Sequence, residues 1–418
     1  MNHSHIALPD QEQTAWQLAV IQLSGWTSLP ILATSILLLE QNSFLGAALT
    51  IIVGNAILWF LRLGIIVMSF AKKQSTLDLA REYLGEVGNY SIAILLLSAT
   101  LVWFTAQTAT ASTSITQLLA INENAEIDQF TQISVLMGLI STLFCMGGIV
   151  ILRKLSTVSF PILVVLFFAI LFGLPKQPLV HATMPLSLSG LTLVLSTNLG
   201  ITADLPTFFR HSKSWRASIL GLTWIQLISI FLGICSLYLG AVLQSGFEIN
   251  QDAIISTGSA ILRFSLIGFV FISTLCANVS NVYSASVGWE LIAPKALVGR
   301  KEYFILGLVL TTIFILVSSV EGIGLQLLQI CDNALVNLCL VLIAGFIISR
   351  RLGRLPDLFE QLTYFAAWLI ASLINFLQVM GWALANFSTV LMGAIAIALA
   401  ISLSLLTRRV IRTDIPRP

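Results

Sequence analysis

Charged residues are scarce in this sequence. Only 10% of the 418 residues are Asp, Glu, Lys or Arg, whereas 57% are hydrophobic, and the mean hydropathy is +0.95. A soluble domain has about 25% charged residues, because charged side chains keep its surface in water. The scarcity of charge therefore excludes a soluble globular domain and predicts an integral membrane protein.

Histidine and cysteine are also rare, with four and five residues. The histidines lie outside the long apolar segments, at positions 3, 5, 181 and 211. The cysteines lie inside those segments, at positions 145, 235, 276, 331 and 339. Neither set has the spacing of a metal site or a disulfide framework, and no apolar segment holds a pair of carboxylates. We therefore expect no enzyme, no metal site and no bound cofactor.

Long apolar stretches are abundant instead. Stretches of about 20 residues, the length needed to cross a hydrocarbon core about 30 Å thick, recur about twelve times. They cover residues 15–39, 46–70, 90–119, 130–152, 156–174, 188–208, 217–244, 260–284, 303–319, 323–349, 359–380 and 386–407. These stretches predict an all-α membrane protein with about twelve transmembrane helices.

Basic residues occupy alternate loops between those spans. All but three of the 21 Lys and Arg residues lie in one set of loops and the C-terminal tail, while the opposite loops hold acidic residues such as Glu123 and Asp252. Basic loops face the cytoplasm, so we expect both termini on the cytoplasmic side of the cell (plasma or inner) membrane. That arrangement requires an even number of spans, which favours twelve. Residues 1–14 lack Lys and Arg, so we do not expect a cleaved signal peptide there.

The loop after the second span has the pattern of a short helix. Ser75 and Asp78 have the spacing of a capping box, leucines follow on one side, and Gly85 and Gly88 end the run. We predict a short interfacial helix on the cytoplasmic surface. A solvated connector is the alternative.

Two spans contain helix-breaking residues near their middle. The first span has Gly25 and Pro30, and the sixth has Gly200 and Pro206. Unwound backbone inside a bilayer is tolerated only where protein or a watery cavity satisfies its polar groups. Because the two interruptions are five spans apart, they predict two inverted repeats of five helices, with a substrate held between broken helices 1 and 6. The sequence contains no repeated pore helix or filter of the kind that a channel needs.

The third span carries an aromatic ring and an amide on one face. Trp103 and Gln107 are four residues apart, so they share a face of a helix. The indole offers a flat stacking surface, and the amide both donates and accepts hydrogen bonds. This pair suits a planar, polar, heterocyclic ligand.

Four segments follow the sequence pattern of one transporter family. They are Trp103-Phe104-Thr105-Ala106-Gln107, which is similar to Trp-Phe-Gly-x-Gln; residues 80–88, which are similar to Ala-Arg-x-x-x-Gly-x-x-Gly; Thr202-Ala203-Asp204 with Phe209, Arg210 and Lys213; and Asn278 with Asn281-Val282-Tyr283-Ser284. Over residues 15–350 the chain thus resembles the nucleobase:cation symporters, which include cytosine, purine and hydantoin permeases.

The resemblance implies a leucine-transporter-type fold of ten core helices and two peripheral ones. The implied core is residues 15–350, with repeats at 15–174 and 188–349; the peripheral helices lie within 351–407, and the tails are 1–14 and 408–418. It also implies import of a nucleobase or related ring by alternating access, coupled to a cation. The expected partners are this small molecule and the lipid bilayer, with no nucleic acid; the sequence indicates no oligomeric state.

The resemblance also assigns substrate-binding residues. Trp103 would stack on the ring, and Gln107 with Asn278 would hydrogen-bond its edge. Trp26 would replace a second aromatic that family members have in the sixth span, because residues 188–201 contain none. The remaining candidates are the polar side chains at the interruption of the sixth span, Ser196 and Asn198.

The coupling ion is less clearly indicated. Sodium-binding members of the family place two hydroxyl side chains directly before the eighth-span Asn, whereas Cys276 and Ala277 stand there in this chain. Two hydroxyl residues lie a turn away, so coupling to Na⁺ and coupling to H⁺ both stay open. The candidate ion-coupling residues are Gly25, Ser273, Thr274 and Asp332.

Three ionisable residues lie where charge is expensive, because an Asp or Arg at the centre of a membrane helix costs about 2.5–3.5 kcal/mol. Asp204 is expected to pair with Arg210 or Lys213 as a cytoplasmic clamp. Asp332 either pairs with Arg62 as a structural strut or stays protonated and serves in coupling or substrate binding. An amino-acid or amine carrier of the same fold, with Asp332 as the counter-charge to a cationic substrate, is the alternative function.

Overall fold

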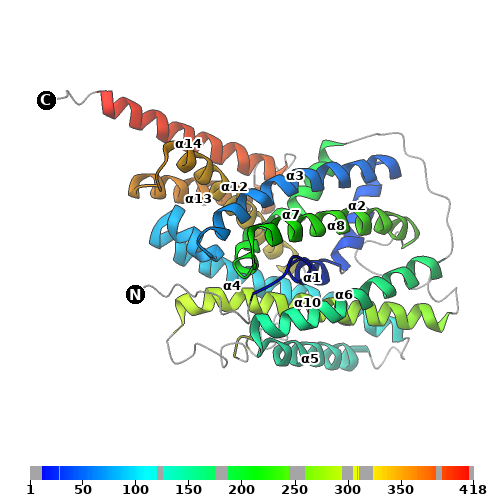
Figure 1. The fold of residues 1–418 in the computed structure, drawn as a ribbon. Coiled ribbons are helices and arrows are strands. Elements are labelled where there is room, and N and C mark those ends of the chain that lie inside the picture. Colours follow the sequence, from blue (N-terminus) through cyan, green and yellow to red (C-terminus); the bar gives the residue numbers. More distant parts are fainter. Residues whose placement is uncertain are drawn as a thin grey trace.

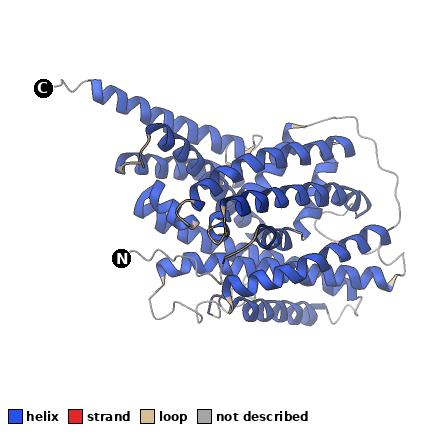
Figure 2. Ribbon diagram, viewed as in Figure 1, coloured by secondary structure: helices blue, strands red, loops and turns tan. Residues whose placement is uncertain are grey.

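The computed structural model describes residues 12–27, 29–119, 126–174, 187–243, 259–293, 305–307, 309, 323–382 and 388–413. Within these ranges the chain is helical except for short turns and one isolated β-bridge between Gln13 and Ser212 (Figure 2). The predicted all-α architecture is therefore confirmed.

The helices follow the predicted spans closely (Figure 1). They are α1 (Ala15–Trp26), α2 (Leu29–Gln41), α3 (Phe44–Phe70), α4 (Thr76–Leu119), α5 (Glu126–Cys145), α6 (Gly148–Gly173), α7 (Leu188–Phe209), α8 (Trp215–Leu243), α10 (Ala260–Ile292), α12 (Ile323–Leu352), α13 (Leu358–Val379) and α14 (Thr389–Thr413). The predicted span 303–319 lies almost wholly outside the described residues.

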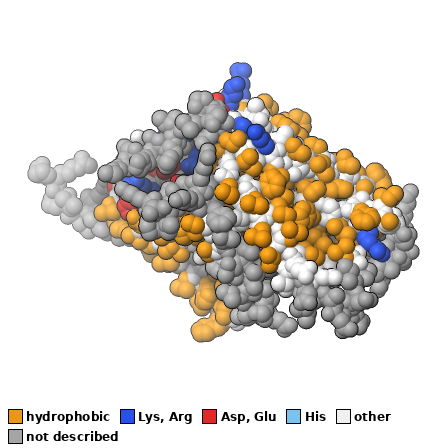
Figure 3. Space-filling view, turned by 90° about the horizontal axis from the view of Figure 1, so that it is seen from below, with side chains coloured by type: hydrophobic (Ala, Val, Ile, Leu, Met, Phe, Trp, Pro, Cys, Tyr) orange, Lys and Arg blue, Asp and Glu red, His pale blue; other side chains and the backbone are white. Residues whose placement is uncertain are grey.

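The surface of the bundle suits lipid and not water. Eight of the described helices are long and apolar enough to cross a membrane. Large side chains such as Phe172 and Ile261 are 81% and 77% exposed, and hydrophobic side chains cover much of the described surface in Figure 3. Burying apolar area in hydrocarbon instead of water stabilises it by roughly 25 cal/mol per Å², so these faces belong in a bilayer.

The first span is broken, as predicted. Thr14 and Gln17 form a capping box at the start of α1, and the helix ends at Trp26. Thr27 has a non-helical backbone (φ −73°, ψ 71°), and α2 begins at Leu29. The interruption thus separates two half-helices within one span.

The sixth span is continuous, so the prediction of a broken helix 6 is wrong. α7 runs from Leu188 to Phe209 with Pro206 in its last turn, where a missing backbone N–H removes one hydrogen bond near the helix end. Its polar side chains also bond to carbonyls one turn earlier. Ser196 Oγ donates to Leu193 O at 3.0 Å, and Asn198 Nδ2 donates to Val194 O at 2.9 Å. These side chains therefore add to the helical bonding and do not replace it.

The predicted surface helix forms the start of α4. The main-chain N–H of Ser75 donates to Asp78 Oδ2 at 2.8 Å, and that of Asp78 donates to Ser75 Oγ at 3.2 Å. Gly85 then has φ 77° and ψ −174°, a conformation that residues with a Cβ rarely adopt. The chain bends there and continues as the third span, so the short helix is confirmed and the alternative of an unstructured connector is not.

The boundary between the fourth and fifth spans differs from the prediction. The turn lies at Met146 and Gly147, and Gly148 has φ 55°. Arg153, expected in the loop, lies inside α6. Its Nη1 donates to Glu12 O at 3.0 Å, so it still lies at the end of the bundle where the described chain begins. A long basic side chain at a helix end reaches polar surroundings without a loop.

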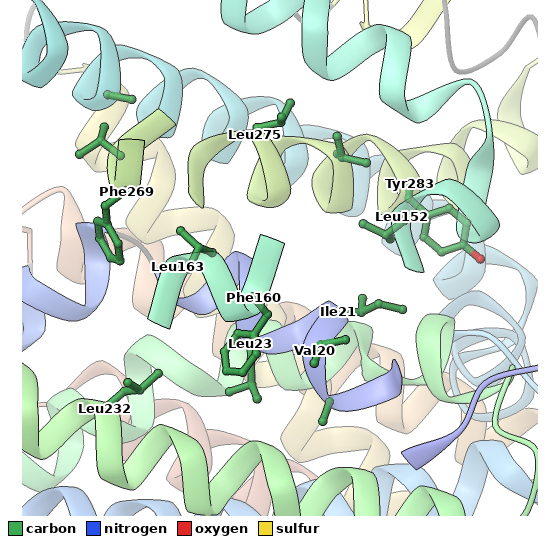
Figure 4. Close-up of a cluster of buried hydrophobic side chains, with 14 of the residues drawn as sticks. Val20, Ile21, Leu23, Leu152, Phe160, Leu163, Leu232, Phe269, Leu275 and Tyr283 are labelled. Carbon is green, nitrogen blue, oxygen red and sulfur yellow. The ribbon is translucent and has the colours of Figure 1, made fainter. Parts of the chain in front are cut away.

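Two hydrophobic cores hold the bundle together. In the first, α1, α6, α8 and α10 meet, and Leu23 of α1 lies beside Phe160 of α6 (Figure 4). The second joins α3, α4, α7, α12 and α13. α10 packs against both α4 and α6, so the eighth span lies next to the third and fifth spans.

Helices α12, α13 and α14 lie together along one edge of the bundle, opposite α5 (Figure 1). Trp368 Nε1 of α13 donates to Ala334 O at 3.0 Å. Asn337 Nδ2 of α12 donates to Asn375 Oδ1 at 2.8 Å. These two hydrogen bonds fix α13 on α12. The division of the chain into core and peripheral helices stays a prediction.

Candidate functional site

Trp103 and Asp332 meet between α4 and α12. The indole Nε1 of Trp103 donates to Asp332 Oδ1 at 2.8 Å. Both side chains are only partly buried. An indole N–H to a carboxylate is a charge-assisted bond when the carboxyl group is ionised. The sequence predicted both residues as candidates but did not predict that they touch.

Gln107 lies one helical turn from Trp103 on the same face, as predicted. Its Oε1 accepts a hydrogen bond from Asn281 Nδ2 at 3.2 Å. Asn278, the expected partner, is fully buried and donates instead to Thr108 Oγ1 at 2.9 Å. Because Asn281 is nearly one turn further along α10, it faces Gln107 where Asn278 does not. The symporter-like motif contained Asn281, but its role was assigned to the neighbouring Asn.

The other candidate substrate residues are placed differently. Trp26 packs against the first hydrophobic core at the end of α1. Ser196 is bonded within α7. Asn198 accepts from Arg62 Nη2 through both its main-chain O at 3.2 Å and its Oδ1 at 3.4 Å. The hydrogen bonds between Arg62 and Asn198 therefore hold α3 against α7.

Arg62 and Asp332 do not pair in the structure. Arg62 Nε donates to Thr202 Oγ1 at 3.0 Å, and its Nη2 donates to Asn198. Asn198 and Thr202 share one face of α7, whereas Gly200, two residues from each, lies on the opposite face. An added Cβ at Gly200 would lie 3.5 Å from Asp332 Oδ1. α7 thus stands between the two ionisable groups, which explains why the predicted strut does not form.

The candidate ion residues surround the interrupted first span. An added Cβ at Gly25 would lie 3.6 Å from Ala277 Cα, so α1 and α10 approach closely at this point. Ser273 Oγ donates to Val270 O at 3.1 Å within α10, and Thr274 is buried beside it. The Cys276 thiol is hydrogen-bonded with the hydroxyls of Ser24 and Ser159. Oxygen-bearing side chains from α1, α6 and α10 therefore converge here.

Asp204 is hydrogen-bonded by hydroxyl groups and forms no ion pair with Arg210 or Lys213 in the described part of the chain, so the expected clamp is wrong. Asp204 Oδ1 accepts from Thr207 Oγ1 at 2.7 Å and lies 3.3 Å from Thr76 Oγ1, while Oδ2 accepts from Ser284 Oγ. Asp204 is partly buried and lies between the start of α4 and the C-terminal parts of α7 and α10. The hydroxyl groups thus donate the hydrogen bonds to Asp204 that we expected from a basic side chain.

Arg210 instead lies beside His211 and Tyr283. Arg210 Nη2 donates to Tyr283 OH at 3.5 Å, and His211 Nε2 lies 3.0 Å from the same oxygen. Burial, with the positive charges of Arg210 and Lys73, lowers the pKa of His211 to about 3. His211 is therefore neutral at physiological pH.

The chain before α1 is bonded to the segment after α7. The main-chain N–H of Gln13 donates to His211 O at 2.8 Å, and that of Lys213 donates to Gln13 O at 3.0 Å. Lys73 Nζ also donates to Ser212 O. Segments that the charge pattern assigned to one side of the membrane are thus joined at one end of the bundle.

No group of three or more His, Cys, Asp or Glu side chains that could hold a metal ion is present in the part of the chain that the structure describes.

Comparison with known proteins supports the fold and leaves the family open. No protein-family model matches the chain, and no curated protein is similar in sequence. Solved structures are similar, however. One is Mhp1, a nucleobase-cation-symport-1 family transporter in a closed conformation with bromovinylhydantoin bound; it is 16% identical with a TM-score of 0.65, covering 98% of this chain and 97% of that one.

Two other transporters share the architecture. A Na⁺-coupled sialic acid symporter in a substrate-bound outward-open state is 12% identical with a TM-score of 0.70, over 94% of this chain and 90% of that one. An Eremococcus coleocola manganese transporter mutant is 12% identical with a TM-score of 0.54, over 98% and 97%. Since all three are transporters and the match covers nearly the whole chain, the predicted leucine-transporter-type fold is confirmed, and this chain is a multi-pass membrane protein with the fold of cation-coupled secondary transporters.

Proposed function

We propose that the chain is a secondary active transporter of the nucleobase:cation symporter type, which imports a nucleobase or related planar ring together with a cation. The observation that carries this proposal is the arrangement of Trp103 and Gln107. Both lie on one face of α4, both are partly buried in the interior, and each bonds to a polar side chain of another helix. An aromatic surface and polar groups that converge in this way are what a planar polar ring needs.

In this proposal Trp103 stacks on the ring. Stacking of a base on an aromatic side chain is worth about 1–3 kcal/mol. Gln107 and Asn281, which already bond to one another, present the remaining polar atoms of their amides to the edge of the ring. A ligand without matching groups leaves those amides unpaired, which is the physical basis of discrimination.

Alternating access requires the bonds at one end of the bundle to break and re-form. The main-chain bonds between Gln13 and residues 211–213 close that end. The interrupted α1 and α2 pair provides a hinge, because the bonding of a continuous helix is missing at Thr27. Movement of α1 away from residues 211–213 would open the route to the side that the basic residues mark as cytoplasmic.

Cation coupling is assigned to the junction of α1 and α10. Hydroxyl and carbonyl oxygens are ligands for hard cations, and Ser24, Ser159 and Ser273 supply hydroxyls there. The hydroxyl pair of sodium-binding relatives is replaced by Cys276 and Ala277, so a proton carried elsewhere is the competing ion. Uptake measured against imposed Na⁺ and H⁺ gradients distinguishes the two.

Competition for uptake tests the substrate class. Uracil, cytosine, adenine and a set of amino acids are added to proteoliposomes that contain the purified chain and a cation gradient. Inhibition by the rings alone supports the proposal. Inhibition by amino acids or amines, with none by the rings, supports a carrier of cationic substrates.

That second candidate function has one observation in its favour. Asp332 accepts a bond from Trp103 and has no ion pair with any basic residue in the described part of the chain. A carboxylate in a membrane interior without a cationic partner is suited to be the counter-charge of a positively charged ligand. An amine would supply that charge, and its cation would also be attracted by the face of the indole.

A further inference from the structure

Asp332 lies beside the surface on which the proposed ring stacks. Trp103 Nε1 donates to Asp332 Oδ1 at 2.8 Å, and an indole N–H lies in the plane of the indole. A ring stacked on that indole is about 3.5–4 Å above it, so the part of the ring over Nε1 is about 5 Å from Oδ1. A ring that stacks there therefore becomes a direct neighbour of the carboxyl group.

This carboxyl group has no basic partner. Within the described residues Asp332 forms no ion pair, and Arg62 donates to Thr202 and Asn198 on the other face of α7. Gly200 of α7 approaches Asp332 without a side chain of its own, since an added Cβ would lie 3.5 Å from Oδ1. Asp332 is nevertheless partly exposed, so solvation by water stabilises its negative charge when no ligand is bound.

Two other titratable groups lie near Asp332. Cys331 is its neighbour on α12, and Asp204 is one turn from Gly200 on the same face of α7. The remaining titratable residues of α12 and of the described helices packed against it lie elsewhere: Arg62 behind α7; those of α4 at or before Tyr90; Cys339, Arg350 and Arg351 two or more turns along α12; Glu360 and Tyr364 at the start of α13; and Arg408, Arg409 and Arg412 towards the end of α14. Protons of Asp204 and Cys331 must therefore be distinguished from a proton of Asp332.

A stacked ring displaces water from Asp332. Loss of water disfavours the charged form of a carboxyl group, and without a basic partner the group becomes neutral by binding a proton. The solvent supplies that proton, because uracil, cytosine and adenine carry no net charge near neutral pH and bind as neutral molecules. One O–H bond forms on Oδ2 and the negative charge is lost, while Oδ1 still accepts from Trp103.

The protonated group also gains a hydrogen bond that it can donate to the ring. A carboxylate only accepts hydrogen bonds, whereas a carboxylic acid donates one and keeps accepting capacity. Its O–H therefore suits a carbonyl oxygen or an unprotonated ring nitrogen, and nucleobases carry such groups at their edges. Proton binding at Asp332 and ring binding on Trp103 thus favour one another.

We propose that Asp332 is a proton-binding site that takes up one proton from solution when a ring stacks on Trp103. This inference rests on the proposed function and locates the proton that stands there as the alternative to Na⁺. Coupling between two ligands is reciprocal, so the protonated site binds the ring more tightly, and departure of the ring releases the proton. Release of both on the cytoplasmic side amounts to symport of ring and proton.

Titration calorimetry of the purified full-length chain in lipid nanodiscs tests this. Uracil, cytosine and adenine are each titrated at one pH in phosphate and in Tris. The two buffers have different enthalpies of ionisation, so the difference in heat gives the number of protons exchanged. At a pH where the free carboxylate is ionised, we expect uptake of about one proton for each ring bound, and the dissociation constant should fall about tenfold for each unit by which the pH is lowered.

Asp332→Asn keeps the size of the side chain and removes the titratable group. It should bind a ring without proton uptake and with an affinity that does not change over the same range of pH. Two matched controls remove the neighbouring titratable groups: Asp204→Asn makes the same change at the other carboxylate, and Cys331→Ala removes the thiol. Both should keep the uptake of about one proton. Gel filtration of each variant verifies folding.

Infrared difference spectra give a second measurement that needs no change at Asp332. Binding of a ring should add a carboxylic-acid carbonyl band to the spectrum of wild type and of Asp204→Asn. Absence of this band from both proteins when a ring is bound overturns the inference, also in the case that Asp332→Asn does not fold.

The remaining outcomes separate this inference from the proposed function. Wild type that binds a ring without proton uptake, or with release of a proton, overturns the inference and leaves the proposed function standing. Uptake that persists in Asp332→Asn, or that is lost in folded Asp204→Asn or Cys331→Ala, also overturns it. Wild type that binds none of the three rings overturns the proposed function, and the inference with it.

Discussion

Arg62 Nε lies 3.0 Å from Thr202 Oγ1, and this bond ties α3 to α7 deep in the bundle. The same guanidinium reaches two oxygens of Asn198. Arg62 is therefore a structural side chain that satisfies acceptors of α7, and its charge is separated from Asp332 by that helix. Fork-shaped donation of this kind is specific to Arg, and Lys cannot reproduce it.

We predict that Arg62→Gln and Asp332→Asn act independently on stability. Because the two groups do not pair, the loss in the double variant should equal the sum of the single losses within about 0.5 kcal/mol. Thermal unfolding of the four proteins in one detergent measures this. Recovery of stability in the double variant would show that the residues pair after all.

Removing one hydroxyl from the Asp204 site should destabilise the chain. Ser284→Ala takes away a hydrogen bond to a carboxylate, and such bonds contribute about 1.5–3 kcal/mol. Arg210→Gln should have a smaller effect on Asp204, because Arg210 bonds to Tyr283 and not to this carboxylate. A double-mutant cycle with Asp204→Asn checks the pairing: coupling to Ser284 is expected, and stronger coupling to Arg210 would contradict it.

Stability should fall as the pH falls below about 6.5 because of His211. Burial and the charges of Arg210 and Lys73 lower the pKa of the folded-state imidazole to about 3, whereas the unfolded value is about 6.5. The unfolded state thus binds a proton that the folded state rejects between these values, so the contribution is complete above 6.5 and is lost as the pH approaches 3. His211→Gln should flatten the slope of unfolding temperature against pH in this window. An unchanged slope would mean that other groups cause it.

Trp103→Ala should weaken binding of a nucleobase by about 1–3 kcal/mol through lost stacking. Gln107→Ala should instead change which ring edges are accepted, because it removes a donor and also releases Asn281. Asn278→Ala should affect folding more than selectivity, since Asn278 is fully buried and bonded to Thr108. Uptake kinetics with cytosine and uracil separate these effects. Normal transport by well-folded Trp103→Ala and Gln107→Ala would remove both residues from the site.

The orientation in the membrane follows from charge alone and needs a direct test. Single cysteines at Glu126 and Gln74, in a background without the five native cysteines, should differ in labelling by an impermeant thiol reagent. We expect labelling of the first and protection of the second in intact cells. The reverse pattern would place the termini outside.

Hydropathy by itself determined where the helices lie. Each described helix overlaps a predicted apolar stretch, because any segment that crosses lipid must be apolar and must satisfy its backbone internally. Local chemistry also predicted the capping of the helix that follows Ser75 and the break near Gly25. Periodicity placed Trp103 and Gln107 on one face. These are properties of neighbouring residues, so a single sequence contains them.

Only the tertiary structure decided which polar groups meet. Arg62 bonds to α7, 136 and 140 positions away, Trp103 bonds to Asp332, 229 positions away, and Asp204 takes hydroxyls where a basic side chain was expected. The choice between Asn278 and Asn281 as the partner of Gln107 depends on the rotation of α10 about its axis. Hydrophobic burial in lipid and in the core sets such rotations through the packing of whole helices, so they are not encoded in the spacing of any one segment.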